Sequence, residues 1–115
     1  MALILVPDEL NPDDCAFLAS VANGLVTARA KYPGNSRRKA GLYGEMGEAM
    51  VAIQRIEQER GTVQELAAEL RQVAQMACRL AVEGDATFSP EVQAQFPCIV
   101  QPDPTLKPHQ PGFRP

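Results

Sequence analysis

The pattern of apolar and polar positions predicts three long helices between residues 11 and 83. Apolar residues recur there at intervals of three and four, which places them on one side of a helix. The predicted rows are Phe17, Leu18, Val21, Leu25 and Ala28 in the first helix, Leu42, Met46, Ala49, Met50, Ile53 and Ile56 in the second, and Leu66, Leu70, Val73, Ala77 and Leu80 in the third. The predicted fold class is therefore all-α.

Residues that favour helix ends bound each of these segments. The residues predicted to begin helices are Asn11 with Pro12, then Asn35 or Ser36, then Thr62 with Glu65, and finally Ser89 with Pro90 and Glu91 for a short fourth helix. The residues predicted to end them are Pro33 with Gly34, Gly61 after a helix reaching about Arg60, Gly84, and Gln95.

Proline content divides the chain into two parts. Residues 1–96 are expected to form one all-α domain. Six of the 19 residues in 97–115 are proline, so no regular element fits that segment and we expect an extended tail. Only Ala2–Val6 has a pattern compatible with a strand.

The three predicted helices offer one apolar row each, which makes a thin core for a chain of 115 residues. Pairing with another copy would bury more apolar surface, as in many helical bundles. We therefore expect self-association into a homodimer or a tetramer.

Composition narrows the possible partners. A net charge of −3, 5% aromatic residues and no tryptophan do not favour stable nucleic-acid binding. The apolar start, Met1–Val6, is too short to span a membrane, and we expect a cytoplasmic protein. Cys15, Cys78 and Cys98 are widely spaced, which is typical of reduced thiols rather than of a zinc site.

Acidic residues on two successive helices are candidate metal ligands. Glu45 and Glu48 project from the same side of the second helix, beside Gly44 and Gly47, which are costly inside a helix. In the third helix, Glu69 and Gln72 lie beside the apolar row. If the two helices pack antiparallel, these oxygens would meet and could bind Mg²⁺. The same spacing also occurs on solvated helix faces.

Basic residues are candidate phosphate ligands. Arg37, Arg38 and Lys39 lie at the start of the second helix, where free N–H groups favour a bound anion. Arg79 lies on the acidic side of the third helix. An exposed basic turn without a ligand is the alternative interpretation.

Three segments resemble a known family. Leu42-Tyr-Gly-Glu-Met-Gly-Glu-Ala49 and Ala68-Glu-Leu-Arg-Gln72 are similar to the E-E-x-x-E and E-x-x-D motifs of the MazG-like all-α nucleoside triphosphate pyrophosphohydrolases. Ala77-Cys-Arg-Leu-Ala-Val-Glu-Gly-Asp85 resembles the end of the third helix in phage-type members. The resemblance covers about residues 30–86.

This resemblance implies a Mg²⁺-dependent enzyme that converts a nucleoside triphosphate to the monophosphate and pyrophosphate. The implied catalytic residues are Glu45, Glu48 and Glu69, and Gln72 joins them as a metal ligand. The sequence departs from the motifs at Gly44 and Gln72, where the family has carboxylates, and Glu65 could compensate. The alternatives are a non-catalytic relative that binds nucleotide or protein, and a helical interaction module. No residue indicates which base or sugar is preferred.

Overall fold

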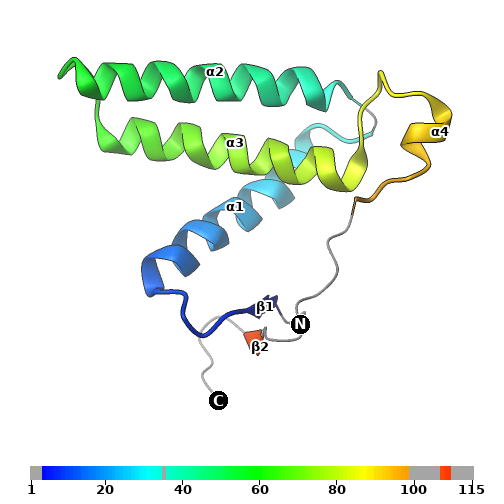
Figure 1. The fold of residues 1–115 in the computed structure, drawn as a ribbon, viewed down its shortest axis with the longest axis horizontal. Coiled ribbons are helices and arrows are strands. Elements are labelled where there is room, and N and C mark those ends of the chain that lie inside the picture. Colours follow the sequence, from blue (N-terminus) through cyan, green and yellow to red (C-terminus); the bar gives the residue numbers. More distant parts are fainter. Residues whose placement is uncertain (1–3, 35, 99–106, 110–115) are drawn as a thin grey trace.

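The fold is known from a computed structural model that describes residues 4–34, 36–98 and 107–109. Its helices are α1 (Pro12–Lys31), α2 (Arg38–Glu57), α3 (Val63–Glu83) and α4 (Pro90–Gln93), and its strands are β1 (Ile4–Val6) and β2 (Lys107–His109). Helices α2 and α3 form an antiparallel hairpin, and α1 crosses α3 at an angle (Figure 1). The prediction of a helical body with three long helices and a short fourth is confirmed.

Local capping explains where most helices begin. The Asn11 side chain accepts a hydrogen bond from the Asp14 backbone N–H (2.8 Å), and the Asp14 carboxylate accepts one from Asn11 N–H (3.2 Å). Thr62 Oγ1 likewise accepts from Glu65 N–H at the start of α3 (3.1 Å). These side chains satisfy N–H groups that have no partner inside the helix. The predicted starts of α1 and α3 are therefore confirmed.

The start of α2 differs from its prediction. The helix begins at Arg38 after Arg37, and no local side chain caps it. Asn35 lies outside the described residues. Instead, the carboxylate of Asp85, from the loop after α3, accepts a hydrogen bond from the Lys39 backbone N–H (2.7 Å). The cap comes from 46 residues away, so local sequence does not indicate it. The helix also ends earlier than expected, at Glu57 rather than about Arg60.

Helix α3 is the centre of the helical body. It packs against both α1 and α2, whereas α1 and α2 do not pack against each other. A Cβ atom at Gly41 would lie 2.7 Å from Cε of Met76, so this glycine allows α2 to approach α3 closely. Among the described residues, the buried apolar ones are Val21, Ala49 and Ala52, which are 6–8% exposed. The core is therefore narrow and built from small side chains.

The predicted apolar rows are only partly buried. The large residues of those rows that remain exposed are Phe17, Leu18, Met46, Met50, Ile53 and Leu70. Their expected burial was wrong because they project from sides of the helices that no described element covers. An apolar row shows that a helix side is suited to burial and does not show what buries it.

One carboxylate joins the three long helices. Glu83 of α3 accepts hydrogen bonds from Arg79 (2.9 and 3.1 Å), from Arg38 of α2 (3.0 Å) and from Arg29 of α1 (3.3 Å). Arg38 and Arg79 are only 2% and 4% exposed. Hydrogen bonding from Arg79, followed by that from Arg29, lowers the pKa of Glu83 to about 2. Glu83 thus balances buried positive charge at the junction of the three helices.

Asp85 forms a second polar anchor, beside the Glu83 junction, where α3 ends and α2 begins. Its side chain is almost fully buried and accepts hydrogen bonds from the Thr87 hydroxyl, from Thr87 N–H (2.9 Å) and from Lys39 N–H. These bonds, that of the Thr87 hydroxyl first, lower the pKa of Asp85 to about 2. The loop after α3 is therefore tied to the first turn of α2.

The two strands pair antiparallel, with Ile4 opposite His109 and Val6 opposite Lys107. The strand pattern noted in Ala2–Val6 is thus confirmed over Ile4–Val6. The expectation that 97–115 contains no regular element was wrong at Lys107–His109. A proline can occupy a short edge strand, because the strand leaves one side without a partner. The predicted extended tail otherwise falls largely on 99–106 and 110–115, which lie outside the described residues.

Two further expectations concern the state of the cysteines and membrane-spanning helices. The three cysteines are free thiols, as expected from their spacing. Within the described ranges, no helix is both long enough and apolar enough to cross a membrane.

The Glu83 junction makes a prediction about stability and pH. The lowered pKa values of Glu83 and Asp85 mean that the unfolded chain binds more protons than the folded one between about pH 5 and pH 2. The free energy of unfolding should therefore fall as the pH is lowered through this range. Glu83→Gln should cost roughly 3–5 kcal/mol at neutral pH, because it leaves buried arginines without their carboxylate, and should flatten the pH dependence.

Denaturant unfolding at fixed protein concentration measures both effects. Glu9→Gln is the control, since Glu9 is exposed and its change should shift the free energy of unfolding by less than about 0.5 kcal/mol. An equal midpoint for Glu83→Gln and the wild type would contradict the role of this junction.

Candidate metal centre

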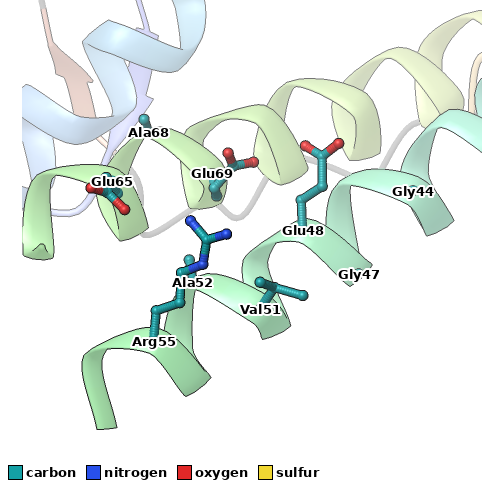
Figure 2. Close-up of a pocket in the computed structure, with 9 residues that line it drawn as sticks. All are labelled: Gly44, Gly47, Glu48, Val51, Ala52, Arg55, Glu65, Ala68 and Glu69. Atoms are coloured by element: carbon teal, nitrogen blue, oxygen red, sulfur yellow. The ribbon is translucent and has the colours of Figure 1, made fainter. Parts of the chain in front are cut away.

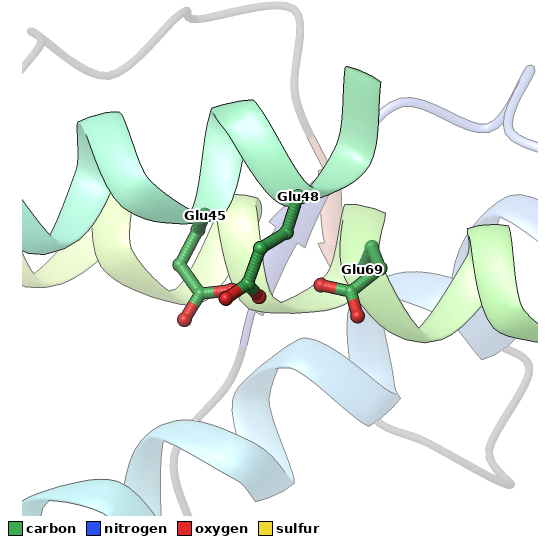
Figure 3. A group of neighbouring side chains, drawn as sticks. All are labelled: Glu45, Glu48 and Glu69. Carbon is green, nitrogen blue, oxygen red and sulfur yellow. The ribbon is translucent and has the colours of Figure 1, made fainter. Parts of the chain in front are cut away.

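Three glutamates from two helices converge on one point. Glu45 and Glu48 are one helical turn apart on α2, and the antiparallel hairpin brings Glu69 of α3 opposite them (Figure 3). One carboxylate oxygen from each residue can be chosen so that all three lie within 4.8 Å of one another. The predicted meeting of Glu45, Glu48 and Glu69 therefore occurs in the structure.

The cluster is electrostatically strained without a cation. Oε2 of Glu45 and Oε2 of Glu69 are buried from solvent and accept no hydrogen bond. Burial, followed by the charge of Glu48, raises the pKa of Glu45. Burial, followed by contact with Glu48, also raises the pKa of Glu69. Carboxylates held this close favour the uptake of a proton or of a positive ion.

The donor set fits a hard divalent cation. All three side chains offer carboxylate oxygens, which Mg²⁺ prefers, and no cysteine or histidine belongs to this group of described residues. The two buried oxygens without partners are the atoms that a bound ion would satisfy. Three carboxylates also leave room for water or phosphate oxygens in the six-coordinate shell of Mg²⁺.

A pocket of about 690 Å³ adjoins the cluster (Figure 2). Its lining residues come from α2 and α3 and are Gly44, Gly47, Glu48, Val51, Ala52, Arg55, Glu65, Ala68 and Glu69. A Cβ atom at Gly44 or Gly47 would meet no atom of a described residue within 4 Å. These two glycines are therefore not needed for packing between helices, and they leave the pocket wall open to a ligand.

Arg55 is a pocket residue that the sequence reasoning missed. It lies seven positions after Glu48, which is two helical turns and about 10 Å along the axis on the same side of α2. Its guanidinium points into the space between α2 and α3 (Figure 2), and it forms no ion pair with any described residue. The signal that could have found it is this spacing of seven from Glu48.

Of the two secondary candidates, Glu65 lines the pocket and Gln72 does not. Both are exposed on α3, one turn to either side of Glu69. The structure therefore brings Glu65 to the pocket, as expected if it compensates for a missing carboxylate. Gln72 lies one turn along the helix from the cluster and remains a predicted ligand.

The predicted phosphate-binding residues lie elsewhere. Arg38 and Arg79 are buried and bound to Glu83, and the anion at the first turn of α2 is the carboxylate of Asp85. Arg38 is about 10 Å along α2 from Glu45.

The other two basic residues also lie away from the cluster. The Lys39 ammonium lies 5.6 Å from the centre of the Phe88 ring, and Arg37 is located just before α2. The structure does not bring this basic group to the acidic cluster.

Three comparisons with known proteins found no relative of this chain. No protein-family model, no curated protein and no solved structure matches this chain. Membership of the MazG-like family therefore stays a prediction that depends on the motifs of Leu42–Ala49 and Ala68–Gln72.

The cluster makes a prediction about metal and stability. Added Mg²⁺ should raise the melting temperature at neutral pH, since a ligand at 100 times its Kd stabilises the folded state by about 2.7 kcal/mol. Glu48→Gln should abolish this rise. Without metal, the same variant should be at least as stable as the wild type, because the repulsion within the cluster is reduced. Thermal unfolding with and without Mg²⁺ measures both effects, and Glu59→Gln serves as the control.

The pH dependence of the metal effect has a defined sign. The raised pKa values of Glu45 and Glu69 mean that the metal-free folded state binds protons more readily than the unfolded chain. Their own contribution to stability therefore rises as the pH falls, while the proton displaces Mg²⁺ and the metal-induced rise disappears. A full Mg²⁺ effect in Glu48→Gln would show that the ion binds elsewhere.

Proposed function

We propose that this chain is a Mg²⁺-dependent nucleoside triphosphate pyrophosphohydrolase. The observation that carries the proposal is the meeting of Glu45, Glu48 and Glu69 beside a pocket large enough for part of a nucleotide. The motif resemblance supports the same reaction. A triphosphate carries the hard oxygen atoms that complete the coordination of Mg²⁺.

Residues at one end of the pocket would bind the metal ion, and a residue at the other end would bind the phosphates. At one end, Glu45, Glu48 and Glu69 would hold Mg²⁺, which when bound neutralises phosphate charge and increases the acidity of water. At the other end, Arg55 would donate hydrogen bonds to phosphate oxygens. Held between them, the triphosphate would be oriented for attack.

The reaction itself consumes one water molecule. The water oxygen forms a bond to the α-phosphorus, and the bond from that phosphorus to the oxygen bridging to the β-phosphorus breaks. The products are the nucleoside monophosphate and pyrophosphate. A carboxylate oxygen of the cluster that does not bind the ion would accept the proton of the attacking water.

The alternative is a non-catalytic relative that binds nucleotide at the same place. Gly44 and Gln72 favour it, since each replaces a carboxylate of the family motif and lowers the negative charge available to Mg²⁺. The two functions share the pocket and differ in turnover, so one assay separates them.

The assay is the release of pyrophosphate from a panel of nucleoside triphosphates with Mg²⁺. The enzyme should release pyrophosphate and monophosphate in equal amounts, and Glu48→Gln should lower kcat/KM on the order of 100-fold, because the metal contributes several kcal/mol to the transition state. Binding of nucleotide without turnover, detected as thermal stabilisation, would replace the hydrolase by the binding protein.

Arg55 gives a second test that does not depend on turnover. Arg55→Ala should weaken the binding of a non-hydrolysable nucleotide with Mg²⁺ by about 10- to 100-fold, the value of a hydrogen bond to a charged group. Arg60→Ala, which makes the same charge change outside the pocket lining, is the control. Calorimetry should also show that Mg²⁺ alone still stabilises Arg55→Ala. Equal nucleotide affinity in Arg55→Ala and the wild type would exclude this residue from the site.

A further inference from the structure

Positive charge is in surplus where the three long helices meet. Six basic residues come from the last turn of α1, the start of α2 and the end of α3, and these are Arg29, Lys31, Arg37, Arg38, Lys39 and Arg79. Two carboxylates contact them, those of Glu83 and Asp85. Six positive and two negative charges leave a net charge of +4, although the whole chain carries −3. We call these eight residues the basic junction.

Contacts hold the charges of the basic junction close together. The carboxylate of Glu83 already binds an arginine from each long helix. The Tyr32 carbonyl oxygen accepts a hydrogen bond from Nη2 of Arg79 (3.0 Å), and the Lys31 ammonium lies 5.4 Å from the centre of the Tyr32 ring. On the α2 side, the Lys39 backbone N–H donates to Asp85 (2.7 Å). The surplus is therefore local, not spread over the surface.

Part of this positive charge is accessible to a ligand. The basic residues that are exposed or half-buried are Arg29, Lys31, Arg37 and Lys39. The Arg29 side chain is 40% exposed and binds Glu83 only through Nε, so its two Nη groups donate to no described residue. Lys31 and Arg37 form no ion pair within the described part of the chain. These cations are available to an anion from solution.

A cavity of about 440 Å³ opens beside the basic junction. Its lining residues are Gly34, Arg38, Glu83 and Gln93. A Cβ atom at Gly34 would meet no atom of a described residue within 4 Å, so this wall is open. The Gln93 side chain is held in place, because Nε2 donates to the Glu83 carbonyl oxygen (2.6 Å) and Oε1 accepts from Asp85 N–H (3.1 Å). The cavity thus combines a fixed wall with room for a small ligand.

We propose that the basic junction binds a small phosphate-type anion, which is free phosphate, pyrophosphate or the phosphate group of a nucleotide. The two Nη groups of Arg29 belong to a planar guanidinium, whose N–H groups match phosphate oxygens, and the ammonium of Lys31 binds phosphate as a point charge. The buried Arg38 and Arg79 stay bound to Glu83 and add to the positive field. An anion with two negative charges would halve the surplus.

The charge of the remaining chain favours a small anion over a nucleic acid. Outside the basic junction the chain has five basic and twelve acidic residues, which is a net charge of −7. A long polyanion would extend over this negative surface and be repelled, whereas a small anion contacts only the basic junction. The acidic cluster around Glu69 is about 20 Å along α3 from Glu83. The anion site is therefore separate from the proposed metal site.

A bound anion would also link two helices that do not contact each other. Helices α1 and α2 each pack on α3 or are joined to it, but not to one another. An anion held by Arg29 or Lys31 of α1 and by Arg37 before α2 would bridge them. Binding to the folded state alone raises its stability. The proposed anion therefore stabilises the end of the hairpin whose polar anchors fix its register.

Thermal unfolding of the full chain in metal-free buffer tests the proposal. Low concentrations of phosphate or pyrophosphate should raise the melting temperature relative to chloride at equal ionic strength, because phosphate affects stability by exclusion from the surface only at high concentration. The double variant Lys31→Gln with Arg37→Gln should weaken anion binding by about 10- to 100-fold. Arg60→Gln is the matched control, since Arg60 is exposed beyond the other end of α2.

Two further measurements separate the possible outcomes. Glu48→Gln, which alters the acidic cluster, should leave the phosphate effect unchanged, and a lost effect would place the anion at the metal site. Phosphorus NMR line widths of pyrophosphate give a readout that does not depend on the stability of a variant. Tighter binding of a nucleoside monophosphate than of phosphate would assign the nucleotide as the ligand, and equal binding would assign the free anion.

Three results would overturn the proposal. The first is an equal melting temperature in phosphate and chloride together with unbroadened pyrophosphate signals. The second is a phosphate effect that the double variant retains in full. The third is tighter binding of a single-stranded oligonucleotide than of pyrophosphate, which would replace the small anion by a nucleic acid.

Discussion

The close approach of α2 and α3 is the constraint on which the site depends. Small residues line their contact, with Gly41 against Met76 and Ala49 and Ala52 buried near the middle of α2. Because the two helices lie so close together, the carboxylate of Glu69 lies next to those of Glu45 and Glu48. The packing that stabilises the hairpin therefore also creates a cluster of repelling carboxylates, which a cation would relieve.

Polar anchors at the end of α3 and the start of α2 fix the register of this hairpin. Glu83 joins all three long helices through arginines, and Asp85 caps α2. A slip of α3 along α2 would break the cap and leave Arg38 buried without a carboxylate. The anchors are about 20 Å along α3 from Glu69, and they hold the cluster in place without taking part in it.

Sequence patterns predicted the features that depend on neighbours along a helix. The capping of α1 by Asn11 and the pairing of Glu45 with Glu48 follow from spacing, and the meeting with Glu69 needed only an antiparallel hairpin. The Asp85 cap and the Arg38–Glu83 ion pair escaped prediction because their partners are more than 40 residues apart. The same reason explains why Arg38 and Arg79 were expected to bind phosphate: a sequence does not show which cations are already paired inside the fold.

The molecule thus combines an acidic site along the α2–α3 hairpin with a basic junction where α3 ends and α2 begins, and α2 and α3 contribute to both. The most direct test of the central claim is a crystal structure of the full chain grown with Mn²⁺, whose anomalous scattering locates the ion. An anomalous peak within coordination distance of Glu45, Glu48 and Glu69 is the predicted result. Well-ordered carboxylates at this place with no peak between them, or with the ion bound elsewhere, would contradict the claim.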